Sequence, residues 1–257
     1  MKSNSLQIDA AFSPAEQPHL ASRPLRDTVC VVFDVLRATS VMVTALGNGA
    51  ESLAPAGEIE EALAWKRRDP ERLLAGEREG LRITAAMTGG TDFDLGNSPA
   101  EFTLERVRGR RIVTTTTNGT RALRACEGAG EVLVGAFLNL SATVRRVRAC
   151  GLSSVLLVGS GTGSETALED ILAVGAAIEE LHHIGATCEL SDAAFIAWST
   201  YRATPGNLAE ALSRAKNGRR LRSMPTLAPD VDLCAALNSQ PLVARLQDGE
   251  VRAQRML

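Results

Sequence analysis

Short apolar runs rich in β-branched residues alternate along the chain with longer amphipathic stretches rich in Ala, Leu, Glu and Arg. Residues 28–34 are continuously apolar until the run ends at Asp34, which is typical of a strand buried on both faces. Further short strands are predicted at residues 51–54, 72–75, 110–115, 131–136 and 153–158. Helices are predicted between and after them, at residues 38–46, 58–68, 119–126, 141–150 and 165–183.

Strands that alternate with helices predict an α/β fold, with right-handed crossovers and a mainly parallel sheet that carries helices on both faces. The C-terminal part differs, because residues 192–222 are helix-rich and residues 242–251 are compatible with a hairpin around an Asp248-Gly249 turn. The chain shows no internal repeat and no evident linker. We therefore expect one α/β domain over residues 1–257, with a helix-rich elaboration at about residues 190–240.

The composition excludes several classes of protein. The 257 residues include 28 basic and 30 acidic side chains, and this balance, a formal net charge of −2, argues against nucleic acid as a partner. No apolar stretch approaches the roughly 20 residues that span a membrane, and residues 1–18 lack the apolar core of a signal peptide. The five cysteines are scattered along the chain, which is typical of reduced thiols, so we expect a cytoplasmic protein.

Polar residues that follow predicted strands are the candidates for chemistry, because parallel sheets bind ligands beyond the carboxyl ends of their strands. The first cluster has Asp34 at the end of a strand and Arg37 three residues later. In one interpretation, Asp34 holds a divalent cation and Arg37 holds an anionic group of a substrate. In the other, the two side chains form a structural ion pair, and Thr39 or Ser40 caps the next helix.

A second cluster, Thr116, Thr117 and Asn118, lies between a predicted strand and a predicted helix. Its hydroxyls, together with the backbone N–H groups at the helix start, suit a phosphate group. The alternative is a threonine-rich strand followed by an ordinary capped turn, which has the same pattern.

A glycine-rich loop at residues 159–164 resembles a dinucleotide-binding fingerprint, but Ser164 replaces its third glycine and no acidic residue ends a strand about 20 residues later. The loop, with Ser160, still suits an anion. Glu169 and Asp170 follow at the start of a predicted helix, where adjacent side chains diverge by about 100°. We expect one of them to reach a metal while the other packs or caps; the alternative is a solvated acidic first turn.

Two turn-rich segments, at residues 76–80 and 93–99, complete the set, and Ser98 before Pro99 is by itself a helix-start pattern. Acidic, basic and hydroxyl side chains together suit a phosphorylated substrate with magnesium, whose preferred ligands are oxygen atoms. The chain has neither a P-loop lysine motif nor a G-x-S-x-G motif. Magnesium-assisted phosphoryl chemistry is therefore the class that the residues favour.

Five of these segments, in this order, resemble the 2-phosphosulfolactate phosphatase family: DVLRAT at 34–39, GER at 76–78, FDLGNSP at 93–99, TTTNGT at 115–120 and LED at 168–170. The resemblance runs from about residue 29 to residue 234, with LSDAA at 190–194 and DLCA at 232–235 as weaker matches. It implies an α/β phosphatase that uses Mg²⁺ to hydrolyse (2R)-2-phospho-3-sulfolactate to 3-sulfolactate and phosphate, a step of coenzyme M biosynthesis.

The resemblance and the charges together predict a metal site and an anion clamp. Magnesium is expected to be held mainly by Asp34, with Glu169 or Asp170 as its second ligand. Arg37 and Arg78 are expected to clamp the phosphate and the sulfonate or carboxylate of the substrate.

The attacking water is expected to be oriented or deprotonated by Glu77 or Asp94, and direct attack of Asp34 on phosphorus stays open. Neutral hydrogen bonds to a small anionic phosphate ester are expected from Asn97, Ser98, Thr116, Thr117, Asn118 and Ser160. A homodimer is expected by analogy only.

One departure from the family pattern is expected to change the substrate preference if the segment lines the pocket. Residues 82–91 form a longer segment than is usual in the family and lack its proline. The alternatives to the named substrate are therefore a different small phosphorylated acid, or a non-catalytic homologue that binds a phosphate ligand.

Overall fold

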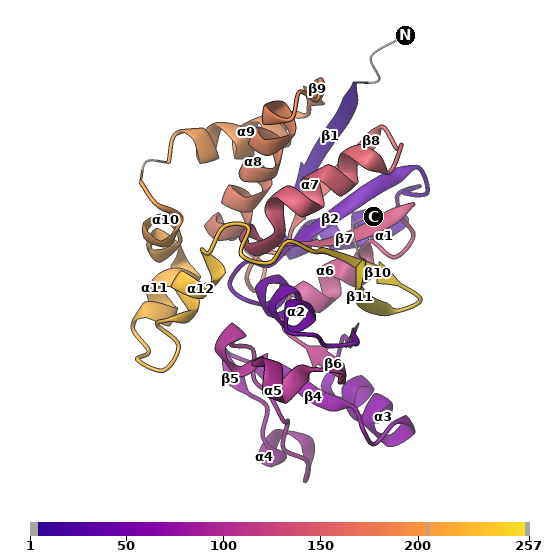
Figure 1. Cartoon of the computed structure of the whole chain (residues 1–257), viewed down its shortest axis with the longest axis vertical. Coiled ribbons are helices and arrows are strands. Elements are labelled where there is room, and N and C mark those ends of the chain that lie inside the picture. The colour runs from indigo at the N-terminus through magenta and orange to yellow at the C-terminus, as the bar shows by residue number, and fades with distance from the viewer. Residues whose placement is uncertain (1–4, 205, 255–257) are drawn as a thin grey trace.

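The computed structural model describes residues 5–204 and 206–254, and one mixed sheet of 11 strands runs through them (Figure 1). Its strand order is β5-β4-β6-β3-β11-β10-β7-β2-β8-β1-β9. The strands are β1 (Leu6–Ala11), β2 (Thr28–Phe33), β3 (Ser52–Pro55), β4 (Leu73–Arg78), β5 (Leu81–Arg82), β6 (Arg111–Thr115), β7 (Glu131–Gly135), β8 (Ser154–Gly159), β9 (Cys188–Leu190), β10 (Val243–Gln247) and β11 (Glu250–Gln254).

The sheet consists of two parallel halves joined by an antiparallel hairpin. In one half β3 and β4 both run parallel to β6, and in the other β7, β2, β8, β1 and β9 are parallel neighbours. The β10–β11 hairpin lies between them, antiparallel to β7 on one side and to β3 on the other. The expected mainly parallel sheet and the expected hairpin are both confirmed, whereas the position of the hairpin inside the sheet was not predicted.

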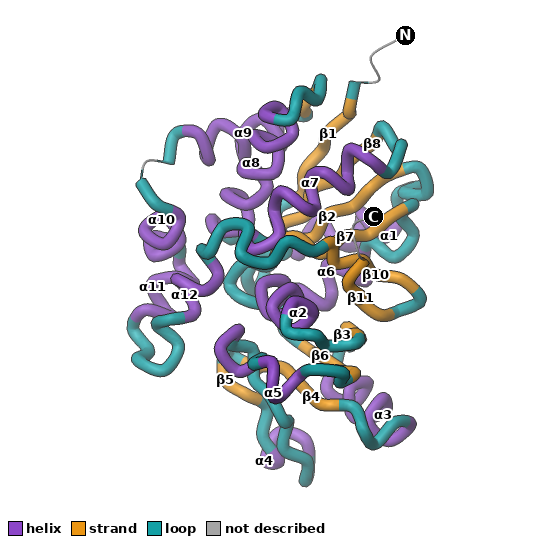
Figure 2. Tube along the Cα trace, viewed as in Figure 1, coloured by secondary structure: helices purple, strands orange, loops and turns teal. Residues whose placement is uncertain are grey.

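Helices cover both faces of the sheet, as the continuously apolar β2 predicts (Figure 2). Val29, Val31 and Phe33 pack into one core cluster, and Cys30 and Val32 pack into the other. The first face is covered by α7 (Leu140–Ala149), α8 (Leu168–His183) and α9 (Asp192–Arg202). The second face is covered by α1 (Gln17–Ser22), α2 (Ala38–Gly47), α5 (Leu104–Val107) and α6 (Gly119–Ala125).

A third, smaller core cluster lies where α3 (Ile59–Arg68) packs on β3, β4 and β6. The expected helix-rich C-terminal part is confirmed and continues beyond α9 as α10 (Leu208–Arg214), α11 (Lys216–Arg222) and α12 (Asp230–Cys234). The remaining short elements are α4 (Ala85–Thr88) and three 3₁₀ turns at Pro14–Glu16, Pro99–Glu101 and Phe137–Asn139.

The two strands at one edge of the sheet, β1 and β9, were absent from the predicted elements. Leu6 and Ile8 of β1 are buried in the core between β8 and β9, but the segment is short and follows polar residues. The long helix also starts later than residue 165, because Thr162 and Glu165 close a turn by pairing their backbones. No helix among the described residues is long and apolar enough to cross a membrane.

Candidate active site

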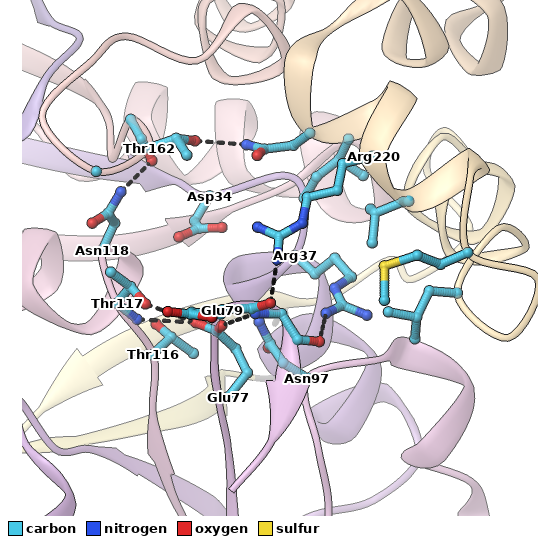
Figure 3. Close-up of a pocket in the computed structure, with 18 residues that line it drawn as sticks. Asp34, Arg37, Glu77, Glu79, Asn97, Thr116, Thr117, Asn118, Thr162 and Arg220 are labelled. Atoms are coloured by element: carbon cyan, nitrogen blue, oxygen red, sulfur yellow. Dashed lines mark hydrogen bonds between the residues drawn. The ribbon is translucent and has the colours of Figure 1, made fainter.

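A cavity of about 230 Å³ lies at the carboxyl ends of β2, β4, β6 and β8, with α11 and the segment after it on the opposite side (Figure 3). This is the edge at which parallel sheets bind ligands. The cavity is lined by Asp34, Leu36, Arg37, Glu77, Glu79, Gly80, Asn97, Thr116, Thr117, Asn118, Gly161, Thr162, Gly163, Asn217, Arg220, Leu221, Met224 and Leu227.

Asp34 lies in the cavity wall directly after β2 and is fixed by the start of α2. Its Oδ1 accepts the N–H of Ala38 at 3.0 Å, and its own N–H donates to Thr39 Oγ1 at 3.0 Å. Burial raises the pKa of the Asp34 carboxyl, and the Ala38 hydrogen bond acts against this shift. A Cβ on Gly119 would lie 2.6 Å from Asp34 Oδ2, so only glycine lets α6 begin this close to the carboxylate.

Arg37 is buried, and its counter-charge is not Asp34. Its Nη1 pairs with Asp230 Oδ2 at 2.6 Å, and its Nη2 donates to the carbonyl of Gly80 at 3.0 Å. The other oxygen of Asp230 accepts the Ser98 hydroxyl at 2.6 Å. The expected alternative of an Asp34–Arg37 ion pair is therefore wrong. Ser98 does precede a short 3₁₀ helix, but its hydroxyl binds Asp230 and does not cap the turn.

Glu77 connects three segments around the cavity. Its Oε1 accepts both the N–H and the hydroxyl of Thr117, each at 3.1 Å, and its Oε2 accepts the N–H of Gly80 at 2.6 Å. Asn118 donates from Nδ2 to the carbonyl of Gly161 at 2.7 Å, which links the loop after β6 to the loop after β8. The second cluster expected around a phosphate, Thr116, Thr117 and Asn118, thus lies in one wall of the cavity.

Glu169 and Asp170 lie behind this wall, both buried, and they have different partners, as expected for adjacent helical residues. Asp170 Oδ1 accepts the N–H of Val35 at 2.9 Å, and its Oδ2 accepts the N–H of Gly161 at 3.0 Å. Glu169 Oε1 accepts Asn217 Nδ2 at 2.6 Å, whereas its Oε2 is buried and has no hydrogen-bond partner among the described residues. Burial is the main cause of a raised pKa at both carboxyls, and the charge of Asp34 adds to it.

Among the three predicted metal ligands, Asp34 and Glu169 are the ones with an oxygen atom that remains available for a cation. Both oxygens of Asp170 already accept backbone hydrogen bonds, so Asp170 anchors the loops after β2 and β8. Within residues 5–204 and 206–254, no group of three or more His, Cys, Asp or Glu side chains is arranged to hold a metal ion. Magnesium is commonly bound through one or two carboxylates, with water and substrate phosphate oxygens as the other ligands. The orphaned Oε2 of Glu169 and the carboxylate of Asp34 fit that mode.

Several residues predicted from the sequence lie outside the cavity lining. Arg78 donates from Nη1 to the carbonyl of Glu77 at 2.8 Å and from Nη2 to Thr115 Oγ1 at 3.2 Å, so it ties β4 to β6. Asp94 is exposed and accepts the N–H of Leu74 at 2.8 Å. Ser98, Ser160, Glu169 and Asp170 lie behind the lining. The structure brings together Asp34, Arg37, Glu77, Asn97, Thr116, Thr117 and Asn118.

Sequence reasoning missed the side of the cavity that the C-terminal helices provide. Asn217 and Arg220 of α11 line it, and Leu221, Met224 and Leu227 give it an apolar wall. Asp230 supports it from α12. The weak family match at residues 232–235 was the signal that pointed toward this region, but it begins after Asp230 and does not include it.

The chain is similar in sequence to known proteins of one family. The family model described as 2-phosphosulpholactate phosphatase matches residues 15–249, which include the whole cavity lining. The chain belongs to the 2-phosphosulfolactate phosphatase family. A Deinococcus radiodurans protein described as a probable 2-phosphosulfolactate phosphatase is 40% identical over 223 residues, 86% of this chain and 89% of the relative. A Caldanaerobacter subterraneus protein with the same description is 36% identical over 236 residues, 91% of this chain and 93% of the relative.

These findings confirm the resemblance seen in the sequence. The five ordered segments lie within the matched residues, and four of them contribute side chains to the cavity lining. The chain is thus a member of a family of phosphoric monoester hydrolases.

Proposed function

We propose that this protein is a magnesium-dependent phosphatase that hydrolyses 2-phosphosulfolactate to 3-sulfolactate and phosphate. The observation that carries the proposal is the cavity itself, which combines a carboxylate, a buried arginine and hydroxyl and amide groups at the carboxyl ends of parallel strands. The relatives named after this reaction support the choice of substrate. The five free cysteines support a cytoplasmic location, and the homodimer stays a prediction.

The phosphate group of the substrate is proposed to lie between Arg37 and the loop after β6. The guanidinium of Arg37 is a rigid fork that suits phosphate oxygens, and Asp230 and the Gly80 carbonyl hold it in place before the substrate arrives. Thr116, Thr117 and Asn118 face the same space from the opposite side. In the reaction the bond between phosphorus and the ester oxygen breaks, a water oxygen bonds to phosphorus, and the ester oxygen gains a proton.

Glu77 is proposed to orient the attacking water and to accept its proton. Glu77 lines the cavity, and hydrogen bonds from Thr117 and Gly80 fix its carboxylate. Asp94, the other candidate for this role, does not line the cavity and is tied to β4. Asp94 is therefore not included in the proposed mechanism.

Asp34 and Glu169 are proposed to hold the magnesium ion. When bound, magnesium would neutralise negative charge on the phosphate oxygens and make phosphorus easier to attack. Asn217 supports this role because it lines the cavity and holds Glu169 Oε1, which leaves Oε2 directed to no other described group.

Phosphate release from a panel of esters, with and without Mg²⁺, tests the proposal. The wild-type protein is expected to release phosphate from 2-phosphosulfolactate only with Mg²⁺. Asp34→Asn is expected to lower kcat by at least about 100-fold, because it removes a charged ligand of the metal. Asp9→Asn is the control, since Asp9 of β1 forms an exposed ion pair with Arg23 and does not line the cavity.

Each other outcome has a distinct meaning. Near-normal Mg²⁺-dependent release by Asp34→Asn would contradict the metal site. Release from other phosphorylated acids but not from 2-phosphosulfolactate would identify a different phosphatase. Calorimetric binding of the esters without any release would identify a phosphate-ligand-binding homologue.

A further inference from the structure

Two basic side chains line the cavity within the described part of the chain, and they come from opposite sides of it. Arg37 follows β2, and Arg220 belongs to α11 in the helix-rich C-terminal part. Both side chains are labelled in Figure 3, where the guanidinium of Arg220 is drawn between Asp34 and the guanidinium of Arg37.

The two arginines differ in how their charges are compensated. Arg37 and Asp230 form an ion pair in which the side chains are only 4% and 1% exposed, so the charge of Arg37 is balanced inside the protein. Arg220 is exposed, and its Nη2 donates to the backbone carbonyl of Glu79. No acidic side chain of the described residues forms an ion pair with Arg220 within 4.0 Å. Of the two arginines, Arg220 is thus the one that has no ion-pair partner among the described residues.

The turn between β4 and β5 fixes the spacing of these groups. Two consecutive backbone carbonyls of this turn each accept a hydrogen bond from one arginine. The Glu79 carbonyl accepts from Arg220, and the Gly80 carbonyl accepts from Arg37. A Cβ on Gly80 would lie 3.7 Å from Arg220 Nη2 and 4.0 Å from Arg37 Nη2. Gly80 also has a φ of +80°, which favours glycine. Both guanidinium groups are therefore held next to each other by the same turn. This arrangement suits a ligand that carries two anionic groups.

We propose that Arg220 is a specificity-determining residue that binds the second anionic group of the substrate, a sulfonate or carboxylate, while Arg37 faces the phosphate. This inference rests on the proposed phosphatase function and names its substrate class: small phosphate esters that carry a further strong acid. A guanidinium donates paired hydrogen bonds to such oxygen groups. The inference also moves to Arg220 a role predicted for Arg78, whose guanidinium donates to the Glu77 carbonyl and the Thr115 hydroxyl.

A matched pair of substrates tests the inference. In isopropyl phosphate a methyl group replaces the carboxylate of 2-phospholactate, so the two esters differ mainly in the second acid. For Arg220→Ala we expect KM to rise about 10- to 100-fold for 2-phosphosulfolactate and 2-phospholactate, the effect of losing a charge-assisted hydrogen bond. For isopropyl phosphate, kcat/KM should change less than about twofold. Arg220→Lys should restore part of the loss, because it keeps the charge.

Arg219→Ala is the control, since Arg219 is exposed on the same helix, donates to the Arg214 carbonyl and does not line the cavity. An equal loss with both esters would show that Arg220 only supports the cavity, and an unchanged KM for the acids would show that it does not bind them. Either result overturns the inference.

If the wild-type protein releases phosphate from no ester, the proposed function fails. Calorimetric titration of the wild type and Arg220→Ala with the same two esters then tests the role of Arg220. A loss of affinity confined to 2-phospholactate then supports its role, and an equal loss overturns it.

Discussion

Arg37 carries a positive charge into a region from which water is almost excluded, and Asp230 is its counter-charge. The two residues are 193 positions apart in the sequence, so this contact forms only when α12 has packed against the loop after β2. Ser98 donates to the same carboxylate and adds the segment before the 3₁₀ turn at Pro99–Glu101 to the cluster. Removing one partner of a buried ion pair usually costs about 3–5 kcal/mol, because it leaves the other charge uncompensated.

Asp230→Asn is therefore expected to lower the free energy of unfolding by about 3 kcal/mol and to raise KM, since Arg37 loses the group that orients it. Urea denaturation and phosphate-release kinetics measure the two effects. Asp232→Asn is the matched control on the same helix: Asp232 pairs with Arg222 but is 60% exposed, so its loss should cost less than about 1 kcal/mol. Equal stability of Asp230→Asn and the wild type would show that the buried pair is not needed.

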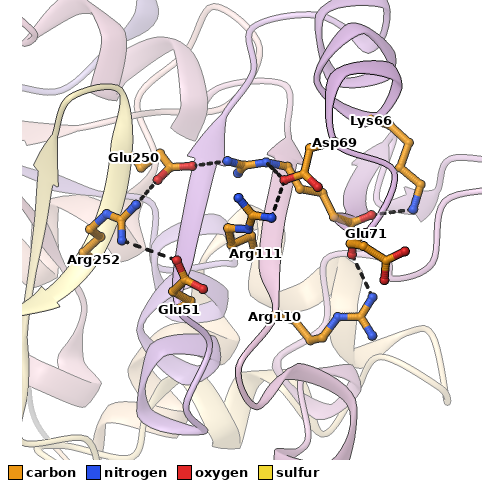
Figure 4. A network of polar contacts seen from close by, with 9 residues as sticks. Glu51, Lys66, Asp69, Glu71, Arg110, Arg111, Glu250 and Arg252 are labelled. Atoms are coloured by element: carbon orange, nitrogen blue, oxygen red, sulfur yellow. Dashed lines mark hydrogen bonds and ion pairs between the residues drawn. The ribbon is translucent and has the colours of Figure 1, made fainter.

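At the scale of elements, the C-terminal hairpin joins the two parallel halves of the sheet. Among the described residues, β11 and β3 are paired at only one position, Val251 with Leu53. Because so few backbone hydrogen bonds join the two strands, side chains must contribute to the junction. Figure 4 shows the polar network around Glu250 and Arg252 that does so. Glu250 also forms an ion pair with Arg72. Arg72 is itself buried, lies 2.5 Å from Glu250 and stacks on Trp65.

Glu250→Gln is expected to lower the free energy of unfolding by about 2 kcal/mol near neutral pH. The loss is smaller than for a buried arginine left without any counter-charge, because Asp69 still forms an ion pair with Arg72. Burial acts to raise the pKa of Glu250, but the hydrogen bond and charge of Arg72, with Arg252, more than offset it and lower the pKa. A lowered folded-state pKa contributes stability above the ordinary glutamate pKa of about 4.3, and this contribution is lost as the pH falls through the folded-state value.

Urea denaturation at about pH 7 and about pH 3 checks this sign, because the difference between the wild type and Glu250→Gln should shrink in acid. The control is Glu51→Gln, whose carboxylate is 51% exposed and lies 3.8 Å from Arg252. A difference that grows in acid would contradict the assignment of the Glu250–Arg72 pair.

The elements also show what local sequence patterns determine. The β2 run, the helices after it and the Asp248-Gly249 turn were predictable, because burial and turn chemistry act over a few residues. The insertion of the hairpin between β3 and β7 was not predictable, since the partners of a strand depend on contacts between distant segments. The same holds for β1, which is defined mainly by its neighbours β8 and β9.

At the scale of the whole molecule, the candidate site lies where the two halves of the sheet meet. In the strand order β3, β11, β10 and β7 separate β6 from β2, yet Gly119 after β6 lies against Asp34 after β2. The Asn118–Gly161 hydrogen bond joins the same two halves. The segments with strand-end motifs were therefore found from the sequence, whereas Arg220 and Asp230 were not. Their positions depend on how the C-terminal helices pack, and a local pattern of hydrophobic residues does not predict that packing.

A ligand that binds such a composite site should stabilise the entire fold. Binding to the folded state alone adds about 2.7 kcal/mol at a ligand concentration 100 times Kd, which corresponds to a rise in Tm of roughly 5–11 °C for a chain of this size. If Asp34 and Glu169 share a magnesium ion with the phosphate held near Arg37, Mg²⁺ and inorganic phosphate must each strengthen the binding of the other.

We therefore expect the two reagents together to raise Tm by more than the sum of their separate effects, as measured by scanning calorimetry. Asp34→Asn should remove this excess and keep the shift caused by phosphate alone, because Arg37 and the hydroxyls of the loop after β6 remain. Asp9→Asn should behave as the wild type, since its ion pair with Arg23 is exposed and Asp9 does not line the cavity. Strictly additive shifts in the wild type would mean that metal and phosphate bind independently, and the shared site proposed at Asp34 would then be wrong.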